Sequence, residues 1–474
     1  MPAGAVPQRQ RVEHIAGGCA LTDIHDVVER ALALSKADAC IVIASRDTQA
    51  NVRWANNTTT TNGVSESSTL AVVSIMDKRV GSVARNYFPD EELESIVRAS
   101  EAACEGKPQA SDYMALLEGG STPPDWAAEP ARTDIGVFDR FTPELANVFE
   151  RARADGVLTF GYAEHTATTT WLGTSSGVRR RDDDARGKVE ITGKSPDFSR
   201  STWAGQGTRT FRDIDTAALY ASIERKLGWM EKSVELPAGH YEALLEPSCV
   251  ADLGLGAYIV ATARDADEGR SVYSKPGGGN RIGERMFGNL SLYSDPAEPG
   301  LETSPFATAL GSGSYSSVFD NGLDVSRTDW VSEGVLRNLI TPRYWQEKTK
   351  AARAVPFIDN LVIGGDGESL DAMIAATKRA LLVTCFWYIR TVDPQTARET
   401  GLTRDGVFLV EDGEVRGAVN NFRWNMSPVA AFAQAVEIGR SAPTLPREWD
   451  EFLLAKAPPM RIENFNMSSV SQAT

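Results

Sequence analysis

The histidines are the first residues to consider for metal or acid–base chemistry in this chain. There are four among 474 residues: His14, His25, His165 and His240. A zinc helix of the HExxxH type needs two histidines on one helical face, with a glutamate beside them. No two of the four histidines are close enough to share a helical turn. The sequence therefore predicts no metal site and no catalytic residue of this type in the chain itself.

The cysteines offer no replacement for such a site. The five of them form no CxxC pair: Cys19, Cys40, Cys104, Cys249 and Cys385. An odd number without close spacing argues against a disulfide framework or a zinc knuckle and favours reduced thiols in the cytoplasm. We expect Cys249 to be a buried apolar residue and His240 to be the polar start of a strand. Cys385 lies in an apolar run, which favours a buried strand over a reactive thiol.

Composition and charge limit the class of protein. The chain is 42% hydrophobic and 24% charged, which is ordinary for a globular protein with a sizeable core. Its net charge of −15 disfavours a nucleic-acid partner, because phosphate binding needs a basic surface. No apolar run approaches the roughly 18 residues of a membrane helix, and the N-terminus has no signal-peptide core. We expect no nucleic acid or membrane partner and a cytoplasmic location.

The order of the predicted elements indicates an α+β fold in a two-domain architecture, with mixed sheets and flanking helices. Residues 1–132 form an N-terminal α+β domain with a trailing linker. Residues 133–236 form a central helical and β-rich region, and residues 237–474 form a β-rich C-terminal domain. Together they are long enough for more than one domain at roughly 100–200 residues each.

Several local patterns predict individual elements. An apolar stripe predicts a helix over residues 23–36. Short strands are expected at 40–45 and 51–55, and a hairpin at 70–76 and 79–85, with Asp77 and Lys78 in its turn.

Two further segments could bind anions but favour simpler interpretations. The charge run at 179–184, RRRDDD, is expected to form a solvated, self-neutralising hairpin tip. Residues 364–369 precede a predicted helix at 369–377, and a helix N-terminus can bind anions. The acidic residues in that loop and the good N-cap Ser369 favour a helix cap instead of a nucleotide site.

Five C-terminal segments occur in a familiar order. They are residues 319–325 (FDNGLDV), 331–336 (VSEGVL), 406–415 (GVFLVEDGEV), 419–425 (VNNFRWN) and 438–439 (IG). This ordered set, together with the N-terminal helix–strand–hairpin–helix pattern, resembles the TldD/PmbA family, also called the modulator of DNA gyrase family. The resemblance spans nearly the whole chain.

The resemblance implies a two-subunit cytosolic peptidase that degrades unfolded or short peptides. In that family TldD carries zinc on two HExxxH histidines and a later cysteine, and its partner PmbA, or TldE, lacks the metal. Residues 271–274 (SVYS) are similar to a family stretch downstream of the metal helix. Counting back places the three metal-helix positions at Gly254, Leu255 and Ile259, none of which binds zinc. No cysteine follows Cys385 to serve as the third ligand.

The sequence thus resembles the metal-free, TldE/PmbA-type subunit, with zinc expected in a TldD-like partner subunit of a heterodimer. Two alternatives are a stand-alone peptide-binding homodimer without proteolysis and a maturation enzyme for a peptide-derived natural product. We expect a peptide substrate to add as a strand to a sheet edge formed by residues 241–245 and 271–274. Tyr273 and Ser271 are the predicted substrate-binding residues, although Tyr273 could equally pack in the core.

Overall fold

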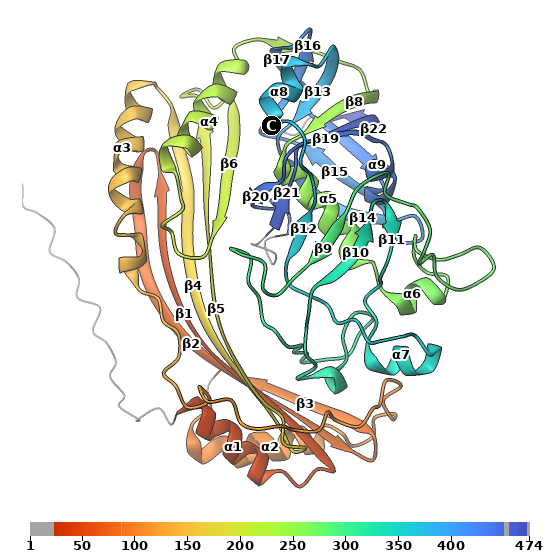
Figure 1. The fold of residues 1–474 in the computed structure, drawn as a ribbon. Coiled ribbons are helices and arrows are strands. Elements are labelled where there is room, and N and C mark those ends of the chain that lie inside the picture. The colour runs from red at the N-terminus through yellow and green to blue at the C-terminus, as the bar shows by residue number, and fades with distance from the viewer. Residues whose placement is uncertain (1–22, 87, 450–454, 472–474) are drawn as a thin grey trace, which may run out of the picture.

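The computed structural model describes residues 23–86, 88–449 and 455–471. Its first part is an antiparallel sheet with the strand order β3-β2-β1-β4-β5-β6. The long strands bend, so the sheet lies beside and beneath the rest of the chain in the view of Figure 1. The six strands are β1 (Ala39–Ala55), β2 (Thr58–Met76), β3 (Arg79–Arg85), β4 (Leu158–Thr174), β5 (Arg179–Lys194) and β6 (Ser201–Thr208).

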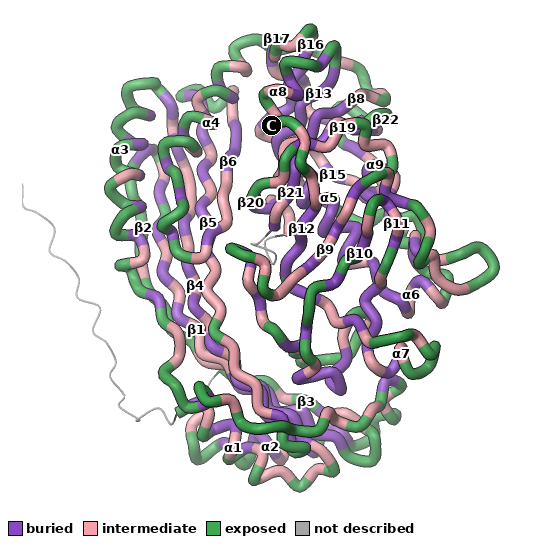
Figure 2. The backbone as a smooth tube through the Cα atoms, in the orientation of Figure 1, coloured by how far each residue is buried: buried purple, intermediate pink, exposed green. Residues whose placement is uncertain are grey.

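Helices cover this sheet near its two ends. Val42 and Ala44 of β1 join the core under α1 and α2, whereas Ile41 and Ile43 pack with Phe319 from the C-terminal part. This alternation follows from the two-residue period of a strand. At the other end α3 and α4 close a second core, and much of the outer surface of α3 is exposed (Figure 2). The four helices are α1 (Ile24–Leu34), α2 (Leu93–Ala102), α3 (Phe141–Ala154) and α4 (Thr216–Trp229).

The C-terminal part contains two further sheets. A six-stranded sheet has the order β11-β10-β9-β12-β21-β20, and a ten-stranded sheet has the order β14-β15-β18-β22-β8-β13-β16-β17-β7, with β19 pairing β22. Both sheets are mixed, because β12 and β21, β13 and β8, and β17 and β7 pair in parallel.

The strands of these two sheets are mostly short. Those of the six-stranded sheet are β9 (Leu292–Ser294), β10 (Thr328–Ser332), β11 (Val335–Leu336), β12 (Leu361–Ile363), β20 (Ala442–Thr444) and β21 (Ala455–Ala457). Those of the ten-stranded sheet are β7 (Ser233–Val234), β8 (Gly239–Leu245), β13 (Arg379–Val383), β14 (Phe386–Asp393), β15 (Arg398–Thr403), β16 (Val407–Glu411), β17 (Glu414–Val419), β18 (Phe422–Met426), β19 (Ala435–Ile438) and β22 (Met460–Val470).

Helix α5 (Pro247–Ile259) lies between the two C-terminal sheets. It contacts β8 of the ten-stranded sheet and β12, β20 and β21 of the other. Every residue from Ser248 to Tyr258 is buried, as expected for a helix that is apolar on all sides. The shorter helices of this part are α6 (Ala263–Asp267), α7 (Arg343–Thr349), α8 (Leu370–Ala375) and α9 (Pro428–Ala433).

Several local predictions are confirmed. The helix expected over 23–36 is α1, and the expected hairpin is formed by β2 and β3. Its turn residues Asp77 and Lys78 have φ values of 47° and 62°, as a tight two-residue hairpin turn requires. Ser369 caps α8, because its side chain accepts a hydrogen bond from the backbone N–H of Ala372 at 3.3 Å.

Two predictions about strands are wrong. The separate strands expected at 40–45 and 51–55 are one continuous strand, β1, because β2 and β4 pair with it along nearly its whole length. The charge run at 179–184 is not a solvated hairpin tip but the start of β5, and the turn precedes it. The Arg181 side chain is 3% exposed, lies over the Trp171 ring and pairs with Asp125 at 3.2 Å.

The α+β class with mixed sheets and flanking helices is confirmed. Residues from both the 1–132 and the 133–236 regions supply neighbouring strands of the first sheet. Strand pairing alone does not define which parts fold independently. The division into domains after residues 132 and 236 therefore stays a prediction. Among the described residues, no helix combines the length and the apolar character that crossing a membrane requires.

Candidate functional site

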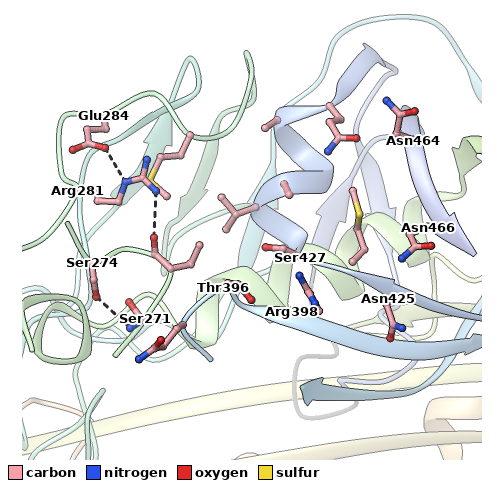
Figure 3. A pocket seen from close by; sticks show the side chains of 18 of the residues that line it. Ser271, Ser274, Arg281, Glu284, Thr396, Arg398, Asn425, Ser427, Asn464 and Asn466 are labelled. Carbon is pink, nitrogen blue, oxygen red and sulfur yellow. Dashed lines mark hydrogen bonds and ion pairs between the residues drawn. The ribbon is translucent and has the colours of Figure 1, made fainter. Parts of the chain in front are cut away.

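A cavity of about 1140 Å³ opens in the C-terminal part of the chain, beside α9 (Figure 3). Five segments that are distant in sequence line it: His240 of β8, the loop at 271–286, the turn at 395–398, residues 425–434, and Asn464 and Asn466 of β22. Small-molecule sites typically occupy roughly 300–1,000 Å³, so this cavity has room for a short peptide segment.

Side-chain amides dominate one wall of the cavity. Asn425 ends β18, Gln434 follows α9, and Asn464 and Asn466 come from β22. The register between β22 and β8 shifts between Ile462 and Phe465, and Asn464 has a φ of 55°. Asparagine tolerates this left-handed conformation, and a bulge changes the direction of the side chains around it. The bulge therefore brings the amide of Asn464 to the cavity.

Two residues that line the cavity each carry a buried oxygen atom without a hydrogen-bond partner among the described residues. The Oγ of Ser427 and the Oε1 of Gln434 are buried, and neither makes a hydrogen bond to the described residues. A buried acceptor without a partner costs about 1–3 kcal/mol, so such atoms are rare in native proteins and need an explanation. Both flank α9, at its start and at its end.

The cavity is positively charged, although the whole chain is acidic. Three arginines and one glutamate line it: Arg281, Arg285, Arg398 and Glu284. The guanidinium of Arg281 donates to Glu284 at 2.7 Å and holds the pKa of that carboxyl below its usual range. Arg285 donates to the carbonyl of Gly288 at 2.6 Å. Within the described part of the chain, the Arg398 side chain makes no hydrogen bond or ion pair, so its guanidinium is available to a ligand.

The three positions that would carry a zinc site lie on α5 and do not fit a metal. Leu255 is fully buried, and a Cβ added at Gly254 would lie 2.4 Å from the Cδ1 of Ile363. Gly254 therefore faces a packed wall, with no room for an imidazole, and Ile259 at the end of α5 has no metal-binding atom. Zinc chemistry cannot be assigned to this helix.

One group of potential metal ligands occurs elsewhere in the described residues. Asp23, His25 and Asp26 bring their ligand atoms within 4.8 Å of one another at the start of α1. The two aspartates are exposed, and such clusters commonly bind no ion. This group does not belong to α5 or to the cavity, so it does not replace the family's metal site.

Two carboxyl groups are buried at α5: Asp252 belongs to the helix, and Glu399 packs against it. A Cβ at Gly256 would lie 2.3 Å from the Oε1 of Glu399, so the absence of a side chain there makes room for this acid. Burial, and then the neighbouring Asp252, raise the pKa of Glu399 to about 8. Burial likewise raises the pKa of Asp252 to about 8, against the hydrogen bond that its Oδ1 accepts from the backbone N–H of Glu448. Both groups are therefore mainly neutral at neutral pH.

Replacing Glu399 with glutamine is expected to stabilise the protein at high pH and to have little effect near pH ~4. An unfolded glutamate titrates near ~4.3. Because the folded-state pKa is raised to about 8, ionisation of the unfolded chain lowers stability as the pH rises between these values. The gain above pH 8 should approach about 5 kcal/mol, from ~3.7 pKa units at ~1.36 kcal/mol each, measured by urea unfolding across pH. Glu463→Gln, at an exposed glutamate, is the control, and an equal effect of both variants would contradict this assignment.

The predicted substrate-binding residues lie in different surroundings. Ser271 lines the cavity, but it is 5% exposed and its Oγ accepts a hydrogen bond from the backbone N–H of Tyr273 at 3.1 Å. Tyr273 is 1% exposed and is absent from the lining. Its ring stacks against Phe287, and its hydroxyl donates to the carbonyl of Ala257 at 2.9 Å. The structure thus places Tyr273 in the core between α5 and the loop.

The predicted sheet edge is wrong. The strand expected at 241–245 is β8, which lies inside the ten-stranded sheet with β22 on one side and β13 on the other. Residues 243–245 are therefore paired on both sides, whereas Tyr241 pairs with β22 alone. Residues 271–274 form a turn and not a strand, with one isolated bridge between Ser274 and Asn280. Neither segment is therefore the edge strand that the sequence predicts.

The interpretations of His240 and Cys249 are confirmed, whereas Cys385 is buried but lies in the two-residue connection between β13 and β14 and not in the predicted strand. His240 is exposed in β8 near its start and lines the cavity, whereas Cys249 and Cys385 are fully buried. His165 lies inside the first sheet with its Nδ1 2.8 Å from the Oγ1 of Thr133 and its Nε2 2.9 Å from the carbonyl of Arg209. Burial lowers the pKa of His165, so its role there is structural.

Apart from Ser271, the sequence did not identify the polar lining of the cavity. Arg398, Ser427, Gln434 and Asn464 share no motif and come from three separate segments. Of the polar residues that line the cavity, Asn425, Ser271 and Ser274 fall within stretches that carry the family resemblance. The order of strands β15, β18 and β22 in one sheet brings Arg398, Asn425 and Asn464 together, which no local pattern signals.

Comparisons with known proteins agree with this architecture. Residues 238–469 match the family profile described as the PmbA/TldA metallopeptidase C-terminal domain. No curated protein matches the chain. Over the whole chain the fold is similar to TldE from Thermococcus kodakarensis, at 15% identity and a TM-score of 0.75, covering 94% of this chain and 99% of TldE.

Two other solved structures share the fold. A protein from Thermotoga maritima described as a modulator of a DNA gyrase has 14% identity and a TM-score of 0.74, with 94% of this chain and 99% of that chain covered. One from Bacteroides thetaiotaomicron described as a modulator of DNA gyrase has 14% identity and a TM-score of 0.72, with 94% and 98% covered. The profile match, the fold and the ordered C-terminal motifs together identify the chain as a member of the TldD/PmbA family.

Proposed function

We propose that this chain is the zinc-free, TldE/PmbA-like subunit of a two-subunit peptidase that acts on unfolded or short peptides. The observation that carries the proposal is that none of the three positions on α5 can hold zinc: Gly254 and Leu255 are buried, and Ile259 has an aliphatic side chain. A subunit of this kind depends on a TldD-like partner for zinc. The similarity to TldE over 94% of the chain supports the same assignment.

The role of the chain in such a complex would be to complete the substrate-binding space and to hold the zinc-bearing subunit in its active form. The amide-lined cavity beside α9 supports a peptide-binding role, because amides pair with a main chain irrespective of its side chains. The four cysteines among the described residues are free and buried, which fits a cytoplasmic location.

Mixing this chain with a TldD-like subunit that carries HExxxH tests the proposal. We expect the two to elute as one complex and the complex to cleave an unstructured peptide, whereas this chain alone does not. Replacing the first histidine of the partner's HExxxH with alanine should abolish peptide turnover without dissociating the complex. Failure to form any complex, with turnover by the partner alone unchanged, would overturn the proposal. Peptide binding by this chain alone, without any complex, would favour the stand-alone peptide binder.

A further inference from the structure

We propose that the cavity beside α9 binds an extended peptide segment through its amide wall and holds a peptide carboxylate on Arg398. This inference deepens the proposed function, since it takes the ligand to be a peptide and names the group that is recognised. The carboxylate could be the C-terminus of the peptide or an aspartate or glutamate side chain. Both sources present the same chemistry to a guanidinium.

The three arginines of the lining differ in their partners, and this difference points to Arg398 as the group that binds a carboxylate. Arg281 is neutralised by Glu284 and Arg285 is engaged with the carbonyl of Gly288, which leaves Arg398 as the cation without a partner among the described residues that line the cavity. A guanidinium pairs with a carboxylate through two parallel hydrogen bonds.

The position of Arg398 fits a peptide that runs along the amide wall. Arg398 begins β15 next to the turn that carries Thr396, and it lies in the same cavity as Asn425 and Ser427 (Figure 3). A peptide main chain offers both N–H donors and C=O acceptors. The asparagine amides supply both donors and acceptors to the remaining main-chain groups.

Calorimetry on the full chain with three matched peptides tests the inference. The probes are N-acetyl-Ser-Ala-Gly-Ser-Ala with a free carboxylate, the same peptide with a C-terminal amide, and an amide in which aspartate replaces glycine. We expect the free acid to bind about tenfold more tightly than the plain amide, with a preference that decreases as salt is added. Equal affinity for the free acid and both amides, or no binding of any probe, would overturn the inference.

The third probe distinguishes the two sources of the carboxylate. If the aspartate amide binds as tightly as the free acid, the site recognises an acidic side chain. If the aspartate amide binds only as tightly as the plain amide, the site recognises the C-terminal carboxylate. Either result supports the inference, because both place a carboxylate in the cavity.

Arg398→Gln assigns the contact. It should bring the affinity of the free acid down to that of the amide while leaving the affinity for the amide and the thermal stability unchanged. Arg423→Gln is the matched control, since Arg423 is exposed on the neighbouring strand β18 and lies outside the lining. A preference for the acid that survives Arg398→Gln would also overturn the inference.

These results separate the inference from the proposed function. If a partner complex forms and cleaves peptides but this chain shows no carboxylate preference, only the inference fails. If the preference is present but no partner complex forms, only the proposed function fails.

Discussion

Tyr273→Ala should lower the free energy of unfolding by about 3–5 kcal/mol, the usual cost of truncating a buried aromatic. The side chain is 1% exposed, its ring stacks against Phe287, and its hydroxyl donates to the carbonyl of Ala257 on α5. Removing it leaves a hole between α5 and the 271–286 loop. Chemical denaturation of the isolated chain measures the change directly.

Tyr273→Phe is the matched control for this prediction. It keeps the ring and removes only the hydrogen bond to Ala257, so the expected loss is about 1 kcal/mol. If Tyr273→Ala were instead nearly neutral for stability and weakened peptide turnover by an assembled complex, Tyr273 would be a substrate contact, as the sequence first suggested. The depth of its burial argues against that result.

Gly254→His should destabilise the protein by more than about 3 kcal/mol and should not create a zinc site. The added Cβ alone would lie 2.4 Å from the Cδ1 of Ile363 and 3.3 Å from the Cδ2 of Leu361. An imidazole at this position would have to displace β12, and its polar nitrogens would be buried among apolar groups. Thermal unfolding with and without added zinc measures both parts of the prediction.

Gly228→His provides the control for Gly254→His. Gly228 lies in α4, is exposed, and would place its Cβ in open space. Because histidine is a better helix former than glycine, this variant should be as stable as the wild type or slightly more stable. A Gly254→His variant that unfolds like the control and gains stability with zinc would contradict the structural role of α5.

Local sequence patterns predicted the elements whose stability is local. The helix α1 follows from its apolar stripe, the β2–β3 turn from Asp77 and Lys78, and the start of α8 from the cap Ser369. The buried positions of Cys249 and Cys385 follow from their apolar neighbours. In each case the residues that determine the structure are within a few positions of one another.

Features that depend on distant pairing were not predictable in the same way. The charge run at 179–184 contains turn-forming residues, but β4 pairs with it over its whole length and keeps it in a strand. The sequence of β8 is typical of a half-buried strand. No nearby residue pattern shows that β22 lies on one side of it and β13 on the other. The cavity likewise depends on strand order. No local pattern in the sequence shows that Arg398 and Asn464 line the same cavity.

Elemental analysis of the isolated, purified chain tests the central claim most directly, namely that α5 is a structural helix in a zinc-free subunit. A structural zinc contributes on the order of 10 kcal/mol of binding free energy, so a native site would retain its metal through purification. The account predicts far less than one zinc per chain and no peptidase activity that a chelator removes. One tightly held zinc per chain, with peptide cleavage that disappears when the zinc is extracted and returns when it is restored, would contradict it.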